Sequence, residues 1–199
     1  MTSDYNGGLT REQFLFYEIR IVAKLIREGY SREEILQKIS DENLFQFPTE
    51  RMVNNLVGVC FKRIDALESE ALVDLLANAS AETAKQVNLY AMMKYNRIVW
   101  DFMTTVIGEK FRTQDFDYSK KDLNIFFMGL QEQVDQVAAW SDSTITKIKQ
   151  VLNKMLIECG YLDSVRSTRL NNVSIEPELE LEIKANNDLA ALPAFNCFN

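Results

Sequence analysis

The sequence WSDSTITKIKQVLNKMLIECGYL, residues 140–162, has the apolar spacing of an amphipathic helix that ends at Gly160. Its apolar residues recur every three or four positions, which places them on one face: Ile145, Ile148, Val151, Leu152, Met155, Leu156 and Cys159. The opposite face carries polar side chains: Ser143, Thr146, Lys147, Gln150, Asn153 and Lys154. This pattern suits the recognition helix of a winged helix-turn-helix. It suits an ordinary surface helix as well, and the pattern alone favours the ordinary one.

The segment after this helix carries the one strand pattern of the sequence. Residues 165–166 and 173–175 are short runs rich in β-branched side chains, and such runs predict a two-stranded β-ribbon. Arg166 and Arg169 would lie on the ribbon, where they can enter a minor groove or hold the DNA backbone. Residues 140–199 are therefore predicted to form a winged-helix-like unit. It would finish with a short helix after Pro177 and a tail from Asn186.

The start of the chain predicts two helices from their capping patterns. Thr10 and Gln13 have the spacing of a capping box for a helix that begins at Arg11. Ser31 and Glu34 have the same spacing for the next helix. Both helices would bury one apolar face.

A third helix is predicted to open at residues 48–49, which completes a helix-turn-helix-like unit over residues 1–78. Its outward face carries side chains that make a second candidate contact surface: Arg51, Asn54, Asn55 and Lys62. The connection before it is longer than the turn of a usual helix-turn-helix. A plain three-helix bundle is therefore the alternative.

Residues 79–139 are predicted to form the central helices of the core. The stretch 83–108 has apolar residues around most of its circumference, which is typical of a helix buried among other helices. Charged residues interrupt it, whereas a membrane-spanning helix needs about 20 largely uncharged residues. Ser119 and Asp122 start a further helix by a capping box.

The composition predicts a mainly α protein that forms one compact body. Nearly half of the 199 residues are apolar, about a quarter are charged, and only seven are Gly and three Pro. No signal-peptide pattern precedes the first helix, so the expected location is the cytoplasm. The formal net charge of −7 disfavours nucleic acid as a partner, but it does not exclude a local basic patch.

The residue types argue against catalysis. The sequence contains no histidine, which excludes Ser-His-Asp and Cys-His nucleophilic systems and any His-ligated metal site. Cys60, Cys159 and Cys197 lie far apart, as expected of reduced thiols, and no phosphate-binding or hydrolase motif occurs. We therefore expect no enzyme activity, cofactor or metal.

The polar face of residues 140–162 has the groups that DNA binding requires. Lys147 and Lys154 lie two helical turns apart and can meet successive phosphates, whereas Lys149 lies beside the apolar face. Thr146, Gln150 and Asn153 lie between them and can reach base edges. Ser143 and Thr144 lie at the helix start, where backbone N–H groups favour a phosphate.

Several short motifs follow one another in a fixed order along the chain. They are Arg27-Glu28-Gly29-Tyr30-Ser31, Asn43-Leu44-Phe45-Gln46-Phe47-Pro48, Lys62-Arg63-Ile64, Gln86, Leu89-Tyr90-Ala91, Asp101-Phe102 and Trp140-Ser141-x-Ser143-Thr144-x-x-Lys147. Their order, over about residues 11–181, resembles that of the BrxA family of BREX bacteriophage-exclusion systems.

The resemblance implies a small, all-helical, cytoplasmic DNA-binding protein that is encoded with a methyltransferase and other BREX components. Members of the family are not known to be enzymes. The prediction is a protein that binds double-stranded DNA mainly through the backbone, with other BREX components as possible partners. Two alternatives stay open: a protein-interaction adaptor within the defence complex and an RNA-binding helical bundle.

Overall fold

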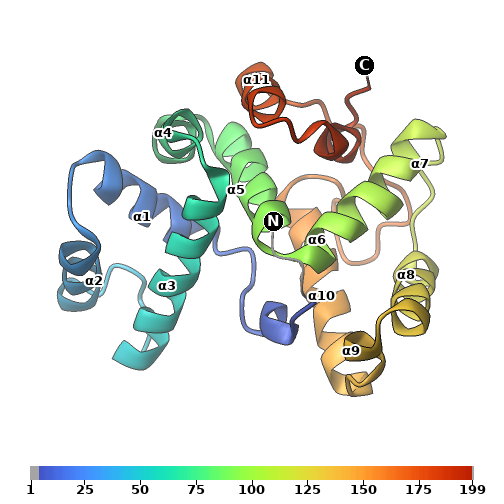
Figure 1. Cartoon of the computed structure of the whole chain (residues 1–199), viewed down its shortest axis with the longest axis horizontal. Coiled ribbons are helices and arrows are strands. Elements are labelled where there is room, and N and C mark those ends of the chain that lie inside the picture. Colours follow the sequence, from blue (N-terminus) through green and yellow to red (C-terminus); the bar gives the residue numbers. More distant parts are fainter. Residues whose placement is uncertain (1–4, 199) are drawn as a thin grey trace.

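The computed structural model describes residues 5–198, and helices dominate this part of the chain (Figure 1). The predicted mainly α class is confirmed. The α-helices are α1 (Phe16–Arg27), α2 (Arg32–Asp41), α3 (Glu50–Leu67), α4 (Glu70–Asn78), α5 (Ala81–Tyr95), α6 (Arg97–Asp101), α7 (Gly108–Arg112), α8 (Lys120–Gln133), α9 (Asp135–Ala138), α10 (Asp142–Glu158) and α11 (Pro177–Ala185). Two 3-10 helices, η1 (Gly7–Thr10) and η3 (Leu189–Phe195), and a π-helix, η2 (Phe102–Ile107), complete the order.

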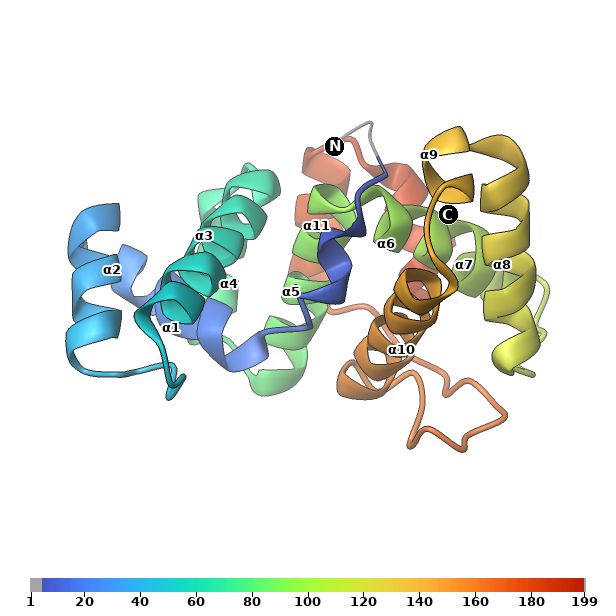
Figure 2. The same ribbon diagram turned by 90° about the horizontal axis from the view of Figure 1, so that it is seen from below.

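The helices are arranged around α5, whose residues from Val87 to Lys94 are all buried. Helices α1 to α4 gather at one end and α6 to α10 at the other (Figure 2). Helix α5 packs against α1, α3 and α4, while α11 covers α4 and α5. The segment from η1 to α1 crosses between the two ends, with η1 resting on α10. Within residues 5–198, no helix combines the length and apolar character that crossing a membrane requires.

Most predicted helix starts are confirmed because capping is a local interaction. Ser31 and Ser119 each form a complete capping box, with Glu34 and Asp122 as the reciprocal partners. Thr49, Ser80 and Ser141 accept backbone N–H bonds at the starts of α3, α5 and α10. These side chains satisfy N–H groups that have no partner inside the helix. Helix α4 was not predicted from the sequence, although it begins after a cap of its own, Ser69.

The predicted start of the first helix at Arg11 is wrong, because α1 begins at Phe16. Residues 11–15 form an irregular strap, and Leu15 lies in the left-handed region with φ 52°. The strap carbonyls bind a buried guanidinium: Arg63 Nη2 donates to the carbonyls of Glu12 and Gln13 at 2.9 and 2.8 Å. Carbonyls held in this way are not available to a helix.

The helix predicted over residues 83–108 is interrupted at Asn96. The Asn96 side chain accepts from the N–H groups of Ile98 and Val99, so one helix ends and another starts there. Further on, the Thr104 and Thr105 hydroxyls donate to backbone carbonyls of the preceding turn, within the π-helical stretch. Side-chain bonds of this kind compete with the regular ladder and bend helices.

The predicted β-ribbon is not formed among the described residues, where residues 163–176 run as turns and irregular backbone. Their backbone partners lie elsewhere in the chain. The Leu170 N–H donates to the Phe116 carbonyl at 2.7 Å, and the Tyr118 N–H donates to the Thr168 carbonyl at 2.9 Å. One isolated antiparallel bridge joins Arg169 to Asp117.

The predicted tail is also wrong, because residues 189–195 pack into the core as η3. Leu192 and Phe195 are almost fully buried, and η3 packs against α7 and η2. The Tyr161 hydroxyl donates to the Ala194 carbonyl at 2.9 Å. A Cβ at Gly108 would lie 3.0 Å from Pro193, so the glycine permits this close approach.

We expect Phe195→Ala to lower the free energy of unfolding by about 3–5 kcal/mol, because it leaves a cavity in the core. Urea unfolding followed by circular dichroism measures this. Phe198, three residues on, is 46% exposed and provides the matched control. Phe198→Ala should change stability by less than about 0.5 kcal/mol. Equal losses in the two variants would contradict the packing of η3.

Candidate nucleic-acid interface

Helix α10 presents the two faces that the sequence pattern predicts. The apolar side chains from Ile145 to Leu156 are buried. On the other face, Ser143, Thr146, Lys147, Gln150 and Lys154 are exposed, and Asn153 is half-buried. The helix therefore offers a row of hydroxyl, amide and ammonium groups to the solvent.

The three lysines of α10 differ in their contacts. Lys149 Nζ donates to Asn124 Oδ1 at 2.8 Å and lies 5.4 Å from the centre of the Phe127 ring. These two contacts place Lys149 between α10 and α8, beside the apolar face as its sequence position indicated, and burial there lowers its pKa. Lys154 Nζ donates to the neutral Gln13 Oε1 at 3.1 Å, and Lys147 is exposed.

The start of α10 is capped from within the protein. Ser141 Oγ accepts from the Thr144 N–H at 3.3 Å and lies within hydrogen-bond distance of the Ser143 and Thr144 hydroxyls. A Cβ at Gly7 of η1 would lie 3.8 Å from Thr144 Cγ2, and Thr144 is half-buried. A phosphate at this end would meet the Ser143 hydroxyl and would compete with Ser141 for the Thr144 N–H.

The two arginines after α10 have different surroundings. Arg166 is exposed in a turn that Ser164 and Ser167 close, with the Ser164 N–H donating to Ser167 Oγ at 3.0 Å. The Arg169 guanidinium lies 5.6 Å from the centre of the Phe116 ring, which fixes its stem against the loop before α8. Arg166 therefore projects into solvent more freely than Arg169.

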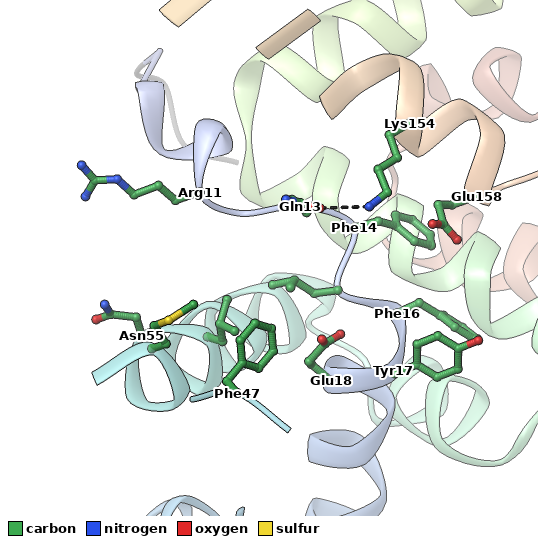
Figure 3. Close-up of a pocket in the computed structure, with 13 residues that line it drawn as sticks. Arg11, Gln13, Phe14, Phe16, Tyr17, Glu18, Phe47, Asn55, Lys154 and Glu158 are labelled. Carbon is green, nitrogen blue, oxygen red and sulfur yellow. Dashed lines mark hydrogen bonds between the residues drawn. The ribbon is translucent and has the colours of Figure 1, made fainter. Parts of the chain in front are cut away.

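The second candidate surface lies on the outer face of α3. Arg51, Asn54, Asn55 and Lys62 are all exposed, as predicted. Asn55 and Lys154 line one cavity of about 640 Å³, together with the strap (Figure 3). Figure 2 shows α10 between α3 and most of the segment at residues 163–176. Helix α3, the strap, α10 and the turn that carries Arg166 therefore follow one another in this order across the molecule.

The basic residues of this succession share one electrostatic property. Among residues 5–198, no carboxylate forms an ion pair with Arg51, Lys62, Lys147, Lys154, Arg166 or Arg169. In contrast, Lys94 and Lys110 each bind two carboxylates. Unpaired, exposed cations can neutralise phosphates without first giving up an intramolecular partner.

One acidic cluster of the chain lies away from this succession, although Glu50 and Asp142 lie in the first turns of α3 and α10. Four glutamates lie at or beside α11: Glu176, Glu178, Glu180 and Glu182. Figure 1 places α11 at the edge opposite the first turns of α3 and α10. Glu180 pairs with Lys184, and Glu182 accepts from the Ser69 hydroxyl. Two carboxylates, Glu18 and Glu158, do line the cavity beside Lys154.

Sequence reasoning missed Arg63 and the strap. Arg63 is 1% exposed and is held by three backbone carbonyls, the third being Phe14 O at 3.0 Å. The signal was its position three residues after Cys60, within the apolar face of α3. Among residues 5–198, no group of three or more His, Cys, Asp or Glu side chains is placed to hold a metal ion. Burial raises the pKa of the Cys60 thiol to about 12, so this thiol stays protonated.

The sequence of the chain matches one protein family over most of its length. The sequence model of the BrxA family matches residues 3–187. The chain belongs to the BrxA family. The resemblance of the ordered motifs is therefore confirmed.

Named members of the BrxA family are similar to this chain over most of their length. A BREX protein BrxA of Bacillus cereus (strain H3081.97) is 32% identical over 165 residues, which cover 83% of this chain and 82% of the relative. A BREX protein BrxA of Paramagnetospirillum magneticum is 25% identical, covering 94% and 91%. A crystal structure of an uncharacterized protein from Magnetospirillum magneticum has 22% identity and a TM-score of 0.81, over 96% of this chain and 97% of that one, and shows the same fold.

Proposed function

We propose that this protein binds double-stranded DNA, mainly through the phosphate backbone, as a non-enzymatic accessory component of a cytoplasmic BREX phage-defence system. The observation that carries the proposal is the succession of exposed cations without ion pairs on α3, α10 and the turn after α10. Relatives named as BREX proteins support its place in the defence system.

In this proposal α10 acts as the recognition helix of the C-terminal unit. Lys147 and Lys154 hold phosphates, while Thr146, Gln150 and Asn153 face the groove between them. The Arg166 turn takes the place of a wing without forming a ribbon. The outer face of α3, in the unit over residues 1–78, adds phosphate contacts through Arg51 and Lys62.

A salt titration tests the proposal. If the protein neutralises about four phosphates, the logarithm of the binding constant should fall with the logarithm of the salt concentration at a slope of about −3.6. Fluorescence anisotropy of a labelled duplex between about 50 and 200 mM salt measures this slope. A binding constant that does not respond to salt, or no binding at the lowest salt, would contradict the proposal.

The same assay separates the two rival functions. An adaptor would co-purify with another defence component and show no response to DNA. An RNA-binding bundle would release the labelled duplex when structured RNA is added, at concentrations where unlabelled duplex does not compete. Neither result is expected of a protein that recognises double-stranded DNA.

A further inference from the structure

The cavity between α3, the strap and α10 lies inside the proposed DNA-contact surface, and apart from Lys154 its lining residues have no role in the proposed backbone binding. Its volume of about 640 Å³ falls within the range typical of small-molecule sites. The strap and the first turn of α1 form one wall, Phe47 and the first turns of α3 form the second, and Lys154 and Glu158 of α10 form the third (Figure 3).

One wall of the cavity is aromatic and open to solvent. Tyr17 is 77% exposed, and its ring lies 5.5 Å from that of Phe16 in an edge-on arrangement. Phe47 and Met52 approach from the side of α3, and Met52 is 42% exposed. Exposed rings at the rim of a cavity provide stacking surfaces for a flat partner, and nucleobases stack on such rings regardless of sequence.

The polar groups around the cavity have opposite charges. Arg11 and Lys154 belong to its lining, and Figure 3 shows the Arg11 guanidinium projecting outward from the strap. Among residues 5–198 neither forms an ion pair, so both can meet phosphates. Glu18 and Glu158 repel phosphates but accept hydrogen bonds from amino groups. Adenine, cytosine and guanine carry an exocyclic amino group, whereas thymine has none.

We infer that this cavity takes an unpaired nucleobase of the bound DNA and prefers bases that carry an amino group. The inference rests on the proposed function, because the phosphates on either side of the base are those of the bound strand. Tyr17 stacks on the base, Arg11 and Lys154 hold the adjacent phosphates, and the two carboxylates accept from the amino group.

Duplexes that differ in one bulged base test the inference. A duplex with a single bulged adenine should bind about tenfold more tightly than the fully paired duplex at equal salt, because stacking adds affinity for each captured base. A bulged thymine in the same sequence should raise the logarithm of the binding constant by less than half as much as the bulged adenine does. Replacing both Glu18 and Glu158 by methionine should make the two bulged duplexes bind equally.

Tyr17→Ala should remove the gain from the bulge and leave the affinity for the paired duplex unchanged. Tyr30→Ala is the matched control, because Tyr30 is 40% exposed and lies outside the cavity. It should keep the full gain. Since Tyr17 is mostly exposed, its loss does not threaten folding, and the paired duplex reports on the integrity of the variant.

The outcomes separate this inference from the proposed function. If the paired duplex binds but a bulge adds nothing, or adds the same in Tyr17→Ala, the inference is overturned and duplex binding stands. A cavity that docks a protein would show as loss of a co-purifying partner in Tyr17→Ala with no change in the bulge effect, and this also overturns the inference. If no DNA binds, the proposed function falls first.

Discussion

Replacing Arg63 by methionine should lower the free energy of unfolding by about 1–2 kcal/mol, because it leaves two partly buried carbonyls without a donor. Arg63 donates to three consecutive strap residues, Glu12, Gln13 and Phe14. The Phe14 carbonyl keeps a second donor, Asn88 Nδ2 at 2.7 Å, but no other donor to the first two carbonyls exists among residues 5–198. Methionine fills similar volume and donates nothing. Urea unfolding measures the loss.

Removing the buried charge of Arg63 has the opposite effect on the free energy of unfolding. It therefore limits how much stability Arg63→Met loses. Burial lowers the pKa of Arg63, which shows that its charged form is penalised in the core. Removing a buried charge recovers part of that penalty. The two stranded carbonyls still outweigh the recovery, although each costs only about 1 kcal/mol because it is partly buried.

Lys62 provides a matched control for Arg63 on the same helix. It is the preceding residue, it carries the same charge, and its side chain is exposed. Lys62→Met should change stability by less than about 0.5 kcal/mol. Arg63→Lys should give an intermediate loss, because one ammonium cannot span three carbonyls as the planar guanidinium does. Equal stability of Arg63→Met and Lys62→Met would show that the strap does not depend on the guanidinium.

The strap also shows why some helix starts were predicted and one was not. Ser31-Glu34 and Thr10-Gln13 have the same spacing, but only the first forms a capping box. A capping box depends on four consecutive residues, so a local pattern can predict it. The fate of residues 11–15 depends on Arg63, about fifty residues away in the sequence. Tertiary contacts of this kind override local preference.

The errors after α10 have the same cause. The β-branched runs near Arg166 and Val173 gave no sign that Thr168 and Leu170, which lie between them, would bond to residues 116–118 instead. The tail was a different case, because a signal was present. Ala191, Leu192 and Phe195 recur at helical spacing and are buried, so their pattern indicated a packed segment.

The sequence pattern predicts which side chains of α10 face solvent, but it does not predict which other elements lie beside this helix. An amphipathic pattern fixes which side chains face solvent, so Lys147 and Lys154 were separated correctly from Lys149. The meeting of α10 with α3 across the strap depends on how helices far apart in the sequence pack. The cavity between them therefore appears only in the folded chain.

Changing both Lys147 and Lys154 to Glu should weaken duplex binding by about 100-fold, because two phosphate contacts are lost and two repulsive charges are added. The salt slope should become less steep by about 1.8, or about 0.9 for each lost contact. Both side chains are exposed, and the bond between Lys154 and Gln13 is an exposed one. The free energy of unfolding should therefore change by less than about 0.5 kcal/mol.

The control must carry the same change of net charge at another surface, since a chain with a formal charge of −7 is already repelled by DNA. Lys24 on α1 and Lys184 on α11 are exposed, and changing both to Glu adds the same negative charge away from α10. The surface pair between Lys184 and Glu180 is lost, at a cost of about 0.5 kcal/mol. A loss of affinity confined to the α10 variant assigns binding to that face. Equal losses in the two variants would mean that affinity follows total charge, and α10 would then be an ordinary surface helix.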